Sequence, residues 1–313
     1  MAETVRDTIK RITKVHLTAG NELFGQCLTA IGWVNNTIPS DAPNLVELSM
    51  ADVMAGGIVV GSALVGKRPI YVVRYQGFQW FNAPIVTNYA GKSKEMWGMP
   101  CPIFIRSIAM EGSIGPVAGS SHHGIYFRMP GIKIASPMTP REYQHVYDTF
   151  MEEDDPIYVS EHRRSYLNDK ELQNRIFEDP DFVLFPFSVT RFEAEKASEE
   201  LEKEGIKVSV FHQLWIRPFL MLDQELENLR KSKFGGLVLD DDYPNGIAKQ
   251  IAYDLMLKAA KPVFALGIKE KAAGFQPLND NLPPTPSEIK NFIKDRVQYE
   301  ARSFNSNACY QDT

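Results

Sequence analysis

The sequence predicts an α/β fold in which helices cover parallel sheets in two domains. Short apolar segments typical of buried strands alternate along the chain with helical segments. The chain has 313 residues, which exceeds the usual size of a single hydrophobic core. A charged stretch at residues 161–180 separates two such alternating patterns. We therefore expect one domain over residues 1–180 and a smaller one over residues 181–313.

The first pattern contains a helix with many small residues, residues 50–65. Each glycine in a helix costs about 1 kcal/mol relative to alanine, so this composition is suited to the close approach of a backbone or ligand. A helix at residues 81–96 is expected to carry Pro84 near its first turn, where a missing N–H is tolerated. The other predicted elements are strands at residues 69–75, 102–106, 131–136 and 156–160, and a helix at residues 140–151.

The second pattern begins at Phe182. We expect strands at residues 206–211, 236–240 and 262–266 and helices at residues 192–204 and 245–259. Gly205 follows the first of these helices, as glycine commonly does at a helix end. Ser287 is the expected N-cap of a final helix, and the chain beyond Arg302 is polar.

The composition excludes several classes of protein. Net charge is −5, with 34 basic and 39 acidic residues and no basic tract, which argues against nucleic acid or an anionic membrane as the main partner. No apolar run approaches the roughly 20 residues that span a bilayer. The charged N-terminus is unlike a secretory signal. Cys27, Cys101 and Cys309 are widely spaced, which favours free thiols in a reducing cytoplasm.

Candidate ligand-binding residues follow two of the predicted strands. Ligands of open parallel sheets bind beyond the carboxyl ends of the strands. Phe78 follows the strand at residues 69–75, and the loop Ser120-Ser-His-His-Gly124 follows the next strand. We expect both segments to lie at the same edge of the sheet.

Several segments, in their order and spacing, resemble one enzyme family. They are Gly66-Lys-Arg-Pro-Ile70 with Phe78 ten residues after Arg68, Pro130-Gly-Ile-Lys-Ile134, Asp155-Pro-Ile-Tyr-Val-Ser-Glu161, Ile216-Arg-Pro218 and Leu239-Asp-Asp-Asp-Tyr-Pro244. This pattern is similar to the beta subunit of the decarboxylating component of 2-oxo-acid dehydrogenases, the pyruvate dehydrogenase type, within the thiamine-diphosphate-dependent transketolase superfamily. The resemblance implies a pyrimidine-binding domain of the transketolase type followed by a transketolase C-terminal domain.

The resemblance also implies a shared active site. This chain would bind the aminopyrimidine ring of thiamine diphosphate, and an alpha-type partner would hold the diphosphate and its Mg²⁺ in an assembly resembling α2β2. In the superfamily that second task belongs to a Gly-Asp-Gly motif, which this sequence lacks. No metal ligands are expected in this chain, since the sequence offers no credible set of the hard oxygen ligands that Mg²⁺ needs.

Asp52 stands where the family has a glutamate that contacts the aminopyrimidine ring and promotes loss of the thiazolium proton. A buried carboxyl group suits this task because burial raises its pKa. Aspartate is one methylene shorter, and a displacement of about 1 Å can cost on the order of 100-fold in rate. The alternative reading is an ordinary acid at a helix N-terminus. Glu47 is a nearby carboxylate that matches a different acidic position.

Phe78 matches the family's aromatic residue that stacks on the pyrimidine; core packing is the alternative. His122 or His123 is expected to contact substrate or move a proton, because a histidine titrates near neutrality, although an exposed loop position is also open. The loop after the pair is about four residues shorter than in the family. The segment His122-His123-Gly124 resembles the loop of carboligating synthases as much as that of the dehydrogenases.

Three functions therefore remain open. The first is a catalytic subunit that decarboxylates a 2-oxo acid and transfers the acyl unit. The second is a split transketolase-like carboligase or ketol transferase acting on a ketose. The third, suggested by Asp52 in place of glutamate, is a non-catalytic regulatory subunit.

Overall fold

A computed structural model describes residues 2–30, 34–111, 117–272 and 281–308. The chain forms two compact units. The first contains the residues up to Leu172, the segment Leu214–Leu220 and the described part of Glu270–Asn281; the second contains the rest. The predicted α/β class with mostly parallel sheets is confirmed. Cys309 lies outside the described residues.

The first unit is built on a seven-stranded sheet among the described residues, in the order β2-β1-β3-β4-β6-β5-β9. All neighbours pair in parallel except β9, which is antiparallel to β5 at one edge. The strands are β1 (Leu23–Gly25), β2 (Leu45–Glu47), β3 (Ile70–Val73), β4 (Phe104–Ala109), β5 (Lys133–Ala135), β6 (Ile157–His162) and β9 (Trp215–Arg217).

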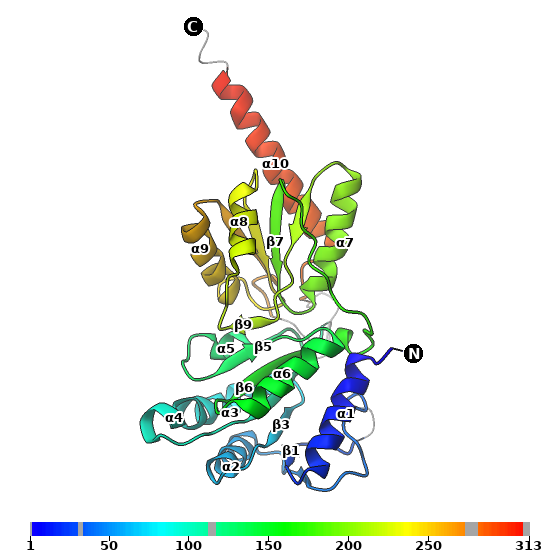
Figure 1. The fold of residues 1–313 in the computed structure, drawn as a ribbon, viewed down its shortest axis with the longest axis vertical. Helices are drawn as coiled ribbons and strands as arrows, with labels where there is room; N and C mark the ends of the chain where they lie inside the picture. The colour runs from blue at the N-terminus through cyan, green and yellow to red at the C-terminus, as the bar shows by residue number, and fades with distance from the viewer. Residues whose placement is uncertain (1, 31–33, 112–116, 273–280, 309–313) are drawn as a thin grey trace. The chain divides into compact units, whose positions relative to one another are not determined.

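Helices α1 (Val5–Thr18) and α6 (Pro140–Glu152) lie side by side in the first unit (Figure 1). Their apolar faces share one core with Phe104 of β4. Helix α2 (Asp52–Leu64) packs against α3 (Gln79–Ile85). The remaining helical segments of this unit are η1 (Gln76–Phe78), η2 (Val86–Ala90), α4 (Gly91–Trp97), α5 (Gly124–Phe127) and η3 (Arg163–Ser165).

The prediction of one regular helix at residues 81–96 is wrong in two respects. The helical segment starts earlier, and Pro84 lies inside α3 rather than in its first turn. The five residues of η2 that follow form a π-helical turn. A proline inside a helix lacks one N–H and crowds the preceding turn, which accounts for the interrupted ladder.

The second unit contains a four-stranded parallel sheet in the order β11-β10-β7-β8. Helices α7 and α10 pack together, and α8 packs against α9 on the other side of the sheet (Figure 1). The elements are β7 (Phe182–Pro186), α7 (Thr190–Lys203), β8 (Val208–Val210), α8 (Asp223–Lys231), β10 (Gly236–Leu239), α9 (Ile247–Ala259), β11 (Val263–Leu266) and α10 (Pro286–Ala308).

The predicted N-cap of the last helix is also wrong. The side chain of Thr285, not Ser287, accepts the N–H of Glu288 at 3.2 Å. The Glu288 carboxylate in turn accepts the N–H of Thr285 at 3.0 Å, which completes a capping box. The helix continues through the polar segment after Arg302 as far as Ala308.

The elements α1, β1, β2, α8 and β9 have no counterpart in the sequence prediction, and neither do the short helical segments η1, α5 and η3. Three of these are strands of only three residues, too short to show a period. None of the helices in the described part of the chain has both the length and the hydrophobicity needed to cross a bilayer.

Candidate functional site

A pocket of about 170 Å³ opens at the carboxyl end of β3 in the first unit. Asp52 and Phe78, predicted separately from the sequence, both line it. The other lining residues are Gln26, Cys27, Met50 and residues 71–75. Pockets for whole drug-sized ligands hold about 300–1,000 Å³, so this one has the size for a single small heterocycle.

Asp52 is the first residue of α2 and lies in its first turn. Its carboxylate is half-buried, and the side-chain amide of Gln26 donates to Asp52 Oδ1 at 3.3 Å. Burial raises the pKa of Asp52 above its ordinary value, against the opposing effect of hydrogen bonds from its own backbone and from Gln26. Such a carboxyl group can share or exchange a proton with a bound ring.

Phe78 ends the short helix η1 directly after β3. Its ring is half-buried and tilted by 31° against Tyr75, with centroids 6.1 Å apart. The centroid of the Phe81 ring lies 6.5 Å from that of the Phe78 ring. An aromatic wall of this kind offers a flat apolar surface to a planar ligand. Neither residue's role is settled by its position, so the roles of Asp52 and Phe78 stay predictions.

The histidine loop lies against the segment that carries Phe78. Gln76 accepts the backbone N–H of His122 at 2.6 Å, and Trp80 Nε1 donates to His122 Nδ1 at 3.3 Å. The pocket-lining Phe78 lies between these two contact residues in the chain. The loop and the pocket wall are therefore held by one short stretch of residues.

His122 is fixed as a neutral ring with its proton on Nε2. An indole N–H can only donate, so Nδ1 of His122 accepts and Nε2 keeps the hydrogen. Burial lowers the pKa of His122 to about 4, so the ring is uncharged at neutral pH. Its Nε2 is buried and has no hydrogen-bond partner among the described residues. The backbone carbonyl of Gly119 acts on the same ring and partly offsets the effect of burial on the pKa of His122.

His123 is fully buried, with Nδ1 2.9 Å from the hydroxyl of Ser160 on β6. Ser160 also accepts a hydrogen bond of 2.8 Å from the side-chain amide of Gln76. The two histidines therefore have different surroundings. The expectation of an exposed loop position does not hold for His123.

Gly77 is the residue that allows the loop to approach this closely. Its N–H donates to the carbonyl of Val117 at 3.2 Å. A Cβ atom at this position would lie 2.6 Å from the same oxygen and 2.7 Å from Val117 Cα, which no real side chain permits. Only glycine fits between η1 and the residues that precede the histidine pair.

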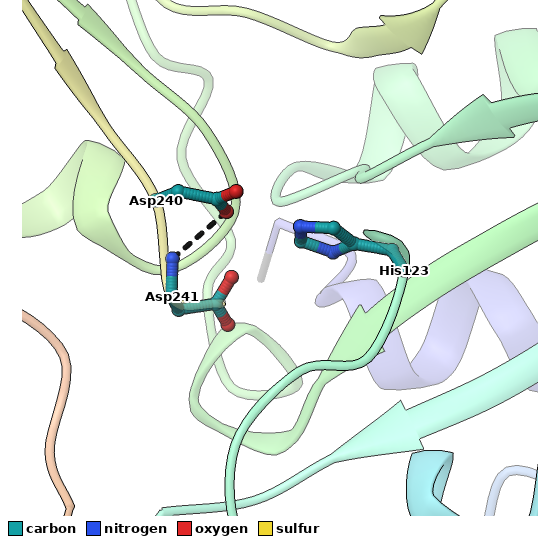
Figure 2. A group of neighbouring side chains, drawn as sticks. All are labelled: His123, Asp240 and Asp241. Carbon is teal, nitrogen blue, oxygen red and sulfur yellow. Dashed lines mark hydrogen bonds between the residues drawn. The ribbon is translucent and has the colours of Figure 1, made fainter. Parts of the chain in front are cut away.

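Two other carboxylate regions have structural partners. Glu47 accepts the backbone N–H groups of Leu28 and Thr29 at 3.0 and 3.3 Å, which anchors a turn. In the second unit, Asp240 accepts the backbone N–H of Asp241 at 2.8 Å (Figure 2). The hydroxyl of Ser188 donates to Asp241 Oδ2 at 2.9 Å. Asp240 and Asp241 are both buried.

The carbonyl groups of the turn before Asp154 accept hydrogen bonds from a guanidinium. Arg68 Nη1 donates to the carbonyl oxygens of Phe150 and Glu153 at 2.6 and 2.7 Å. Arg68 Nη2 also lies 3.6 Å from Asp154. The positive charge at this turn thus belongs to the chain itself.

Sequence reasoning missed Gln26, Gln76 and Ser160. Gln76 carried a usable signal, because a polar side chain two residues before the predicted stacking aromatic lies at the same strand end. Gln26 and Ser160 carried none, since their proximity to Asp52 and His123 comes from chain segments far apart in sequence.

Residues 29–168 match a family model described as the transketolase pyrimidine-binding domain. The chain is 24% identical to the pyruvate dehydrogenase E1 component subunit beta of Staphylococcus epidermidis, over 68% of this chain and 70% of that protein. It is 26% identical to the 2-oxoisovalerate dehydrogenase subunit beta of Bacillus subtilis, over 66% of this chain and 68% of that protein.

Solved structures show the same fold. A split-gene transketolase, described as an inactive beta4 tetramer, superposes with a TM-score of 0.70 at 13% identity, covering 95% of this chain and 99% of that one. The transketolase of Campylobacter jejuni gives a TM-score of 0.71 at 16% identity, covering 94% of this chain and 47% of that one. The predicted resemblance to dehydrogenase beta subunits of the transketolase superfamily is confirmed, as is the transketolase-type fold.

Proposed function

We propose that this chain, which carries a transketolase-type pyrimidine-binding domain, is the beta-type subunit of a thiamine-diphosphate-dependent enzyme. The enzyme decarboxylates a 2-oxo acid and transfers the acyl unit, and this chain supplies the pyrimidine-binding half of its active site. The observation that carries the proposal is the pocket in which Asp52, Gln26 and Phe78 meet.

The residues present fit an aminopyrimidine ring. The pocket has the volume for one heterocycle, an aromatic wall and a half-buried carboxyl group whose pKa is raised by burial. Phe78 would hold one face of the ring, and Asp52 would hold a proton at a ring nitrogen. When bound, thiamine diphosphate supplies the nucleophilic carbon and electron sink for cleavage of the bond next to the substrate carbonyl.

Asp52 is shorter than the glutamate of the family, and Gln26 supports it. The Gln26 amide donates to Oδ1 and leaves Oδ2 for the ligand. We propose that Asp52 is active in this arrangement and not a sign of a regulatory subunit. His122 would contact the substrate as a neutral ring whose Nδ1 is held by the indole N–H of Trp80.

The diphosphate and Mg²⁺ are assigned to an alpha-type partner. The sequence lacks a Gly-Asp-Gly motif, and the dehydrogenase relatives are themselves named as subunits. We propose an α2β2 assembly in the cytoplasm, in keeping with the free thiols of Cys27 and Cys101.

A split transketolase-like carboligase is the second candidate. It is favoured by the resemblance of His122-His123-Gly124 to the loop of carboligating synthases and by the fold shared over nearly the full length of a split-gene transketolase. The two candidates differ in the acceptor of the two-carbon or acyl unit and not in how the cofactor ring is held.

The test is co-expression with a Gly-Asp-Gly-containing chain encoded nearby, followed by assays with 2-oxo acids, lipoamide and aldehydes. Decarboxylation with acyl transfer to lipoamide supports the first candidate, and ligation to an aldehyde alone supports the second. Asp52→Asn is expected to abolish turnover, whereas Asp41→Asn, at a carboxylate 73% exposed, is the matched control. Full activity of Asp52→Asn would show that this subunit is not catalytic.

A further inference from the structure

A chain of hydrogen bonds runs from Gln76 through Ser160 to the buried ring of His123. The atoms involved are the Gln76 amide, the Ser160 hydroxyl and His123 Nδ1, with separations of 2.8 and 2.9 Å. Gln76, Ser160 and His123 are each at most 1% exposed. Because no bulk water competes at such positions, the direction of each hydrogen bond follows from which group can donate.

The orientation of the Gln76 amide is fixed by its other neighbours. Its oxygen accepts the backbone N–H of His122 at 2.6 Å, and its nitrogen donates to the carbonyl of Ser107 at 3.2 Å. A flipped amide would place N–H against N–H and oxygen against oxygen. The nitrogen of Gln76 therefore faces Ser160, and Ser160 Oγ accepts there.

The hydroxyl hydrogen of Ser160 then has one acceptor. Among the described residues, the hydroxyl of Ser160 hydrogen bonds only to Gln76 and His123. If His123 Nδ1 carried a hydrogen, the hydroxyl hydrogen of Ser160 would be buried without an acceptor, which is unfavourable. Ser160 donating to an unprotonated Nδ1 satisfies both groups.

We propose that Gln76 and Ser160 are positioning residues that hold neutral His123 in the form with its hydrogen on Nε2. Resting on the proposed function, this gives the active site a neutral His123 that holds its hydrogen on Nε2 and does not act as a base at Nδ1. Both histidines of the loop then carry Nε2–H, His122 through Trp80 and His123 through Ser160.

The tautomer is measured directly on the full-length chain. Histidine is labelled with ¹⁵N, long-range ¹⁵N–¹H correlation spectra are recorded near neutral pH, and His123 is assigned from the signals lost in His123→Asn. In the wild type, His123 is expected to show an unprotonated Nδ1 and a protonated Nε2. A protonated Nδ1 in the wild type overturns the proposal, whatever the variants do.

Ser160→Ala removes the donor, so the Nδ1 signal should move toward that of a mixture of tautomers. Ser160→Thr keeps a hydroxyl and should restore the wild-type pattern. Ser107→Ala is the matched control, because Ser107 is a buried serine paired in register with Ser160 on the neighbouring strand, and its hydroxyl contacts Gln79. An unchanged spectrum of Ser160→Ala overturns the proposal.

These spectra need neither the cofactor nor the partner chain, so they separate this inference from the proposed function. Binding of thiamine diphosphate is then measured by calorimetry for the wild-type chain with its alpha-type partner. Absence of binding would refute the proposed function and leave the tautomer result standing. With the complex active, Ser160→Ala should lower kcat and leave the affinity for thiamine diphosphate unchanged, and loss of that affinity alone would contradict the positioning role.

Discussion

Arg106 and Glu161 form an ion pair in the interior of the first unit, with each side chain only 1% exposed. Two hydrogen bonds of 2.7 and 3.1 Å join the guanidinium to the carboxylate. Tyr143 and Tyr166 donate to the same carboxylate at 2.6 and 2.5 Å. Glu161 directly follows Ser160 on β6. The pair therefore links β4, the strand before the histidine loop, to β6, the strand that carries Ser160.

Removing one partner of this pair should destabilise the protein severely. Glu161→Ala leaves a buried guanidinium without its counterion and is expected to cost about 3–5 kcal/mol of unfolding free energy. Tyr166→Phe, which removes one hydrogen bond to a charged group, should cost about 1.5–3 kcal/mol. Urea unfolding monitored by circular dichroism measures both. An unfolding free energy of Glu161→Ala equal to that of the wild type would contradict the burial of the Arg106–Glu161 pair.

Gly77→Ala should displace the histidine loop. The new methyl group would overlap the carbonyl of Val117, so either η1 or the loop must shift and the Gln76–His122 hydrogen bond is lost. We expect lower stability and lower turnover. Gly57→Ala is the control: it lies inside α2 with open space around it and should gain about 0.5–1 kcal/mol.

Asp52→Glu tests whether the site is adapted to the shorter acid. Because Gln26 holds the Asp52 carboxylate in place, an extra methylene moves the acid toward the ring by about 1 Å, and we expect turnover to fall on the order of 100-fold. Steady-state kinetics of the assembled enzyme measures this. An increase in kcat would mean that Asp52 is a weakened version of the family's glutamate.

Trp80→Phe should release His122 from its neutral state. The side chain of Trp80 is 60% exposed, so the change should affect stability little. The variant loses the indole N–H that donates to His122 and part of the ring that shields the imidazole from water. Both losses should raise the pKa of His122 from about 4 toward its ordinary 6.5. NMR titration of the His122 ring follows the change, with Trp97→Phe, at an exposed tryptophan on α4, as the control. Identical titration curves for Trp80→Phe and wild type would exclude this role.

Stability should fall on mild acidification. Burial lowers the pKa of both His16 and His122 to about 4, below the value of 6.5 in the unfolded chain. The unfolded state therefore binds more protons between these values, and unfolding free energy rises with pH there by up to about 1.4 kcal/mol per pH unit for each residue. Denaturant unfolding from pH 4 to 7 measures the slope. His122→Asn should reduce the slope, and His145→Asn, which removes an exposed imidazole, should not.

The sequence predicted the elements whose patterns are local. The strand before Phe78 and the small-residue helix beginning at Asp52 follow from runs of apolar and small residues. The long helix with Pro84 was predicted wrongly because a π-helical turn depends on packing. Such a turn produces no hydrophobic periodicity that the sequence could show. The short strands β1 and β2 depend on pairing with β3, which is also a tertiary effect.

For the site, the sequence by itself placed Phe78 and the histidine pair after predicted strands and Asp52 near the start of a small-residue helix. Only the tertiary structure decided that Gln26 reaches Asp52 and that Ser160 reaches His123, across 26 and 37 residues of chain. The physical reason is that motif spacing records local backbone geometry, whereas burial and hydrogen-bond partners depend on which distant segments the sheet brings together. Protonation states follow from those partners, so they belong to the folded structure.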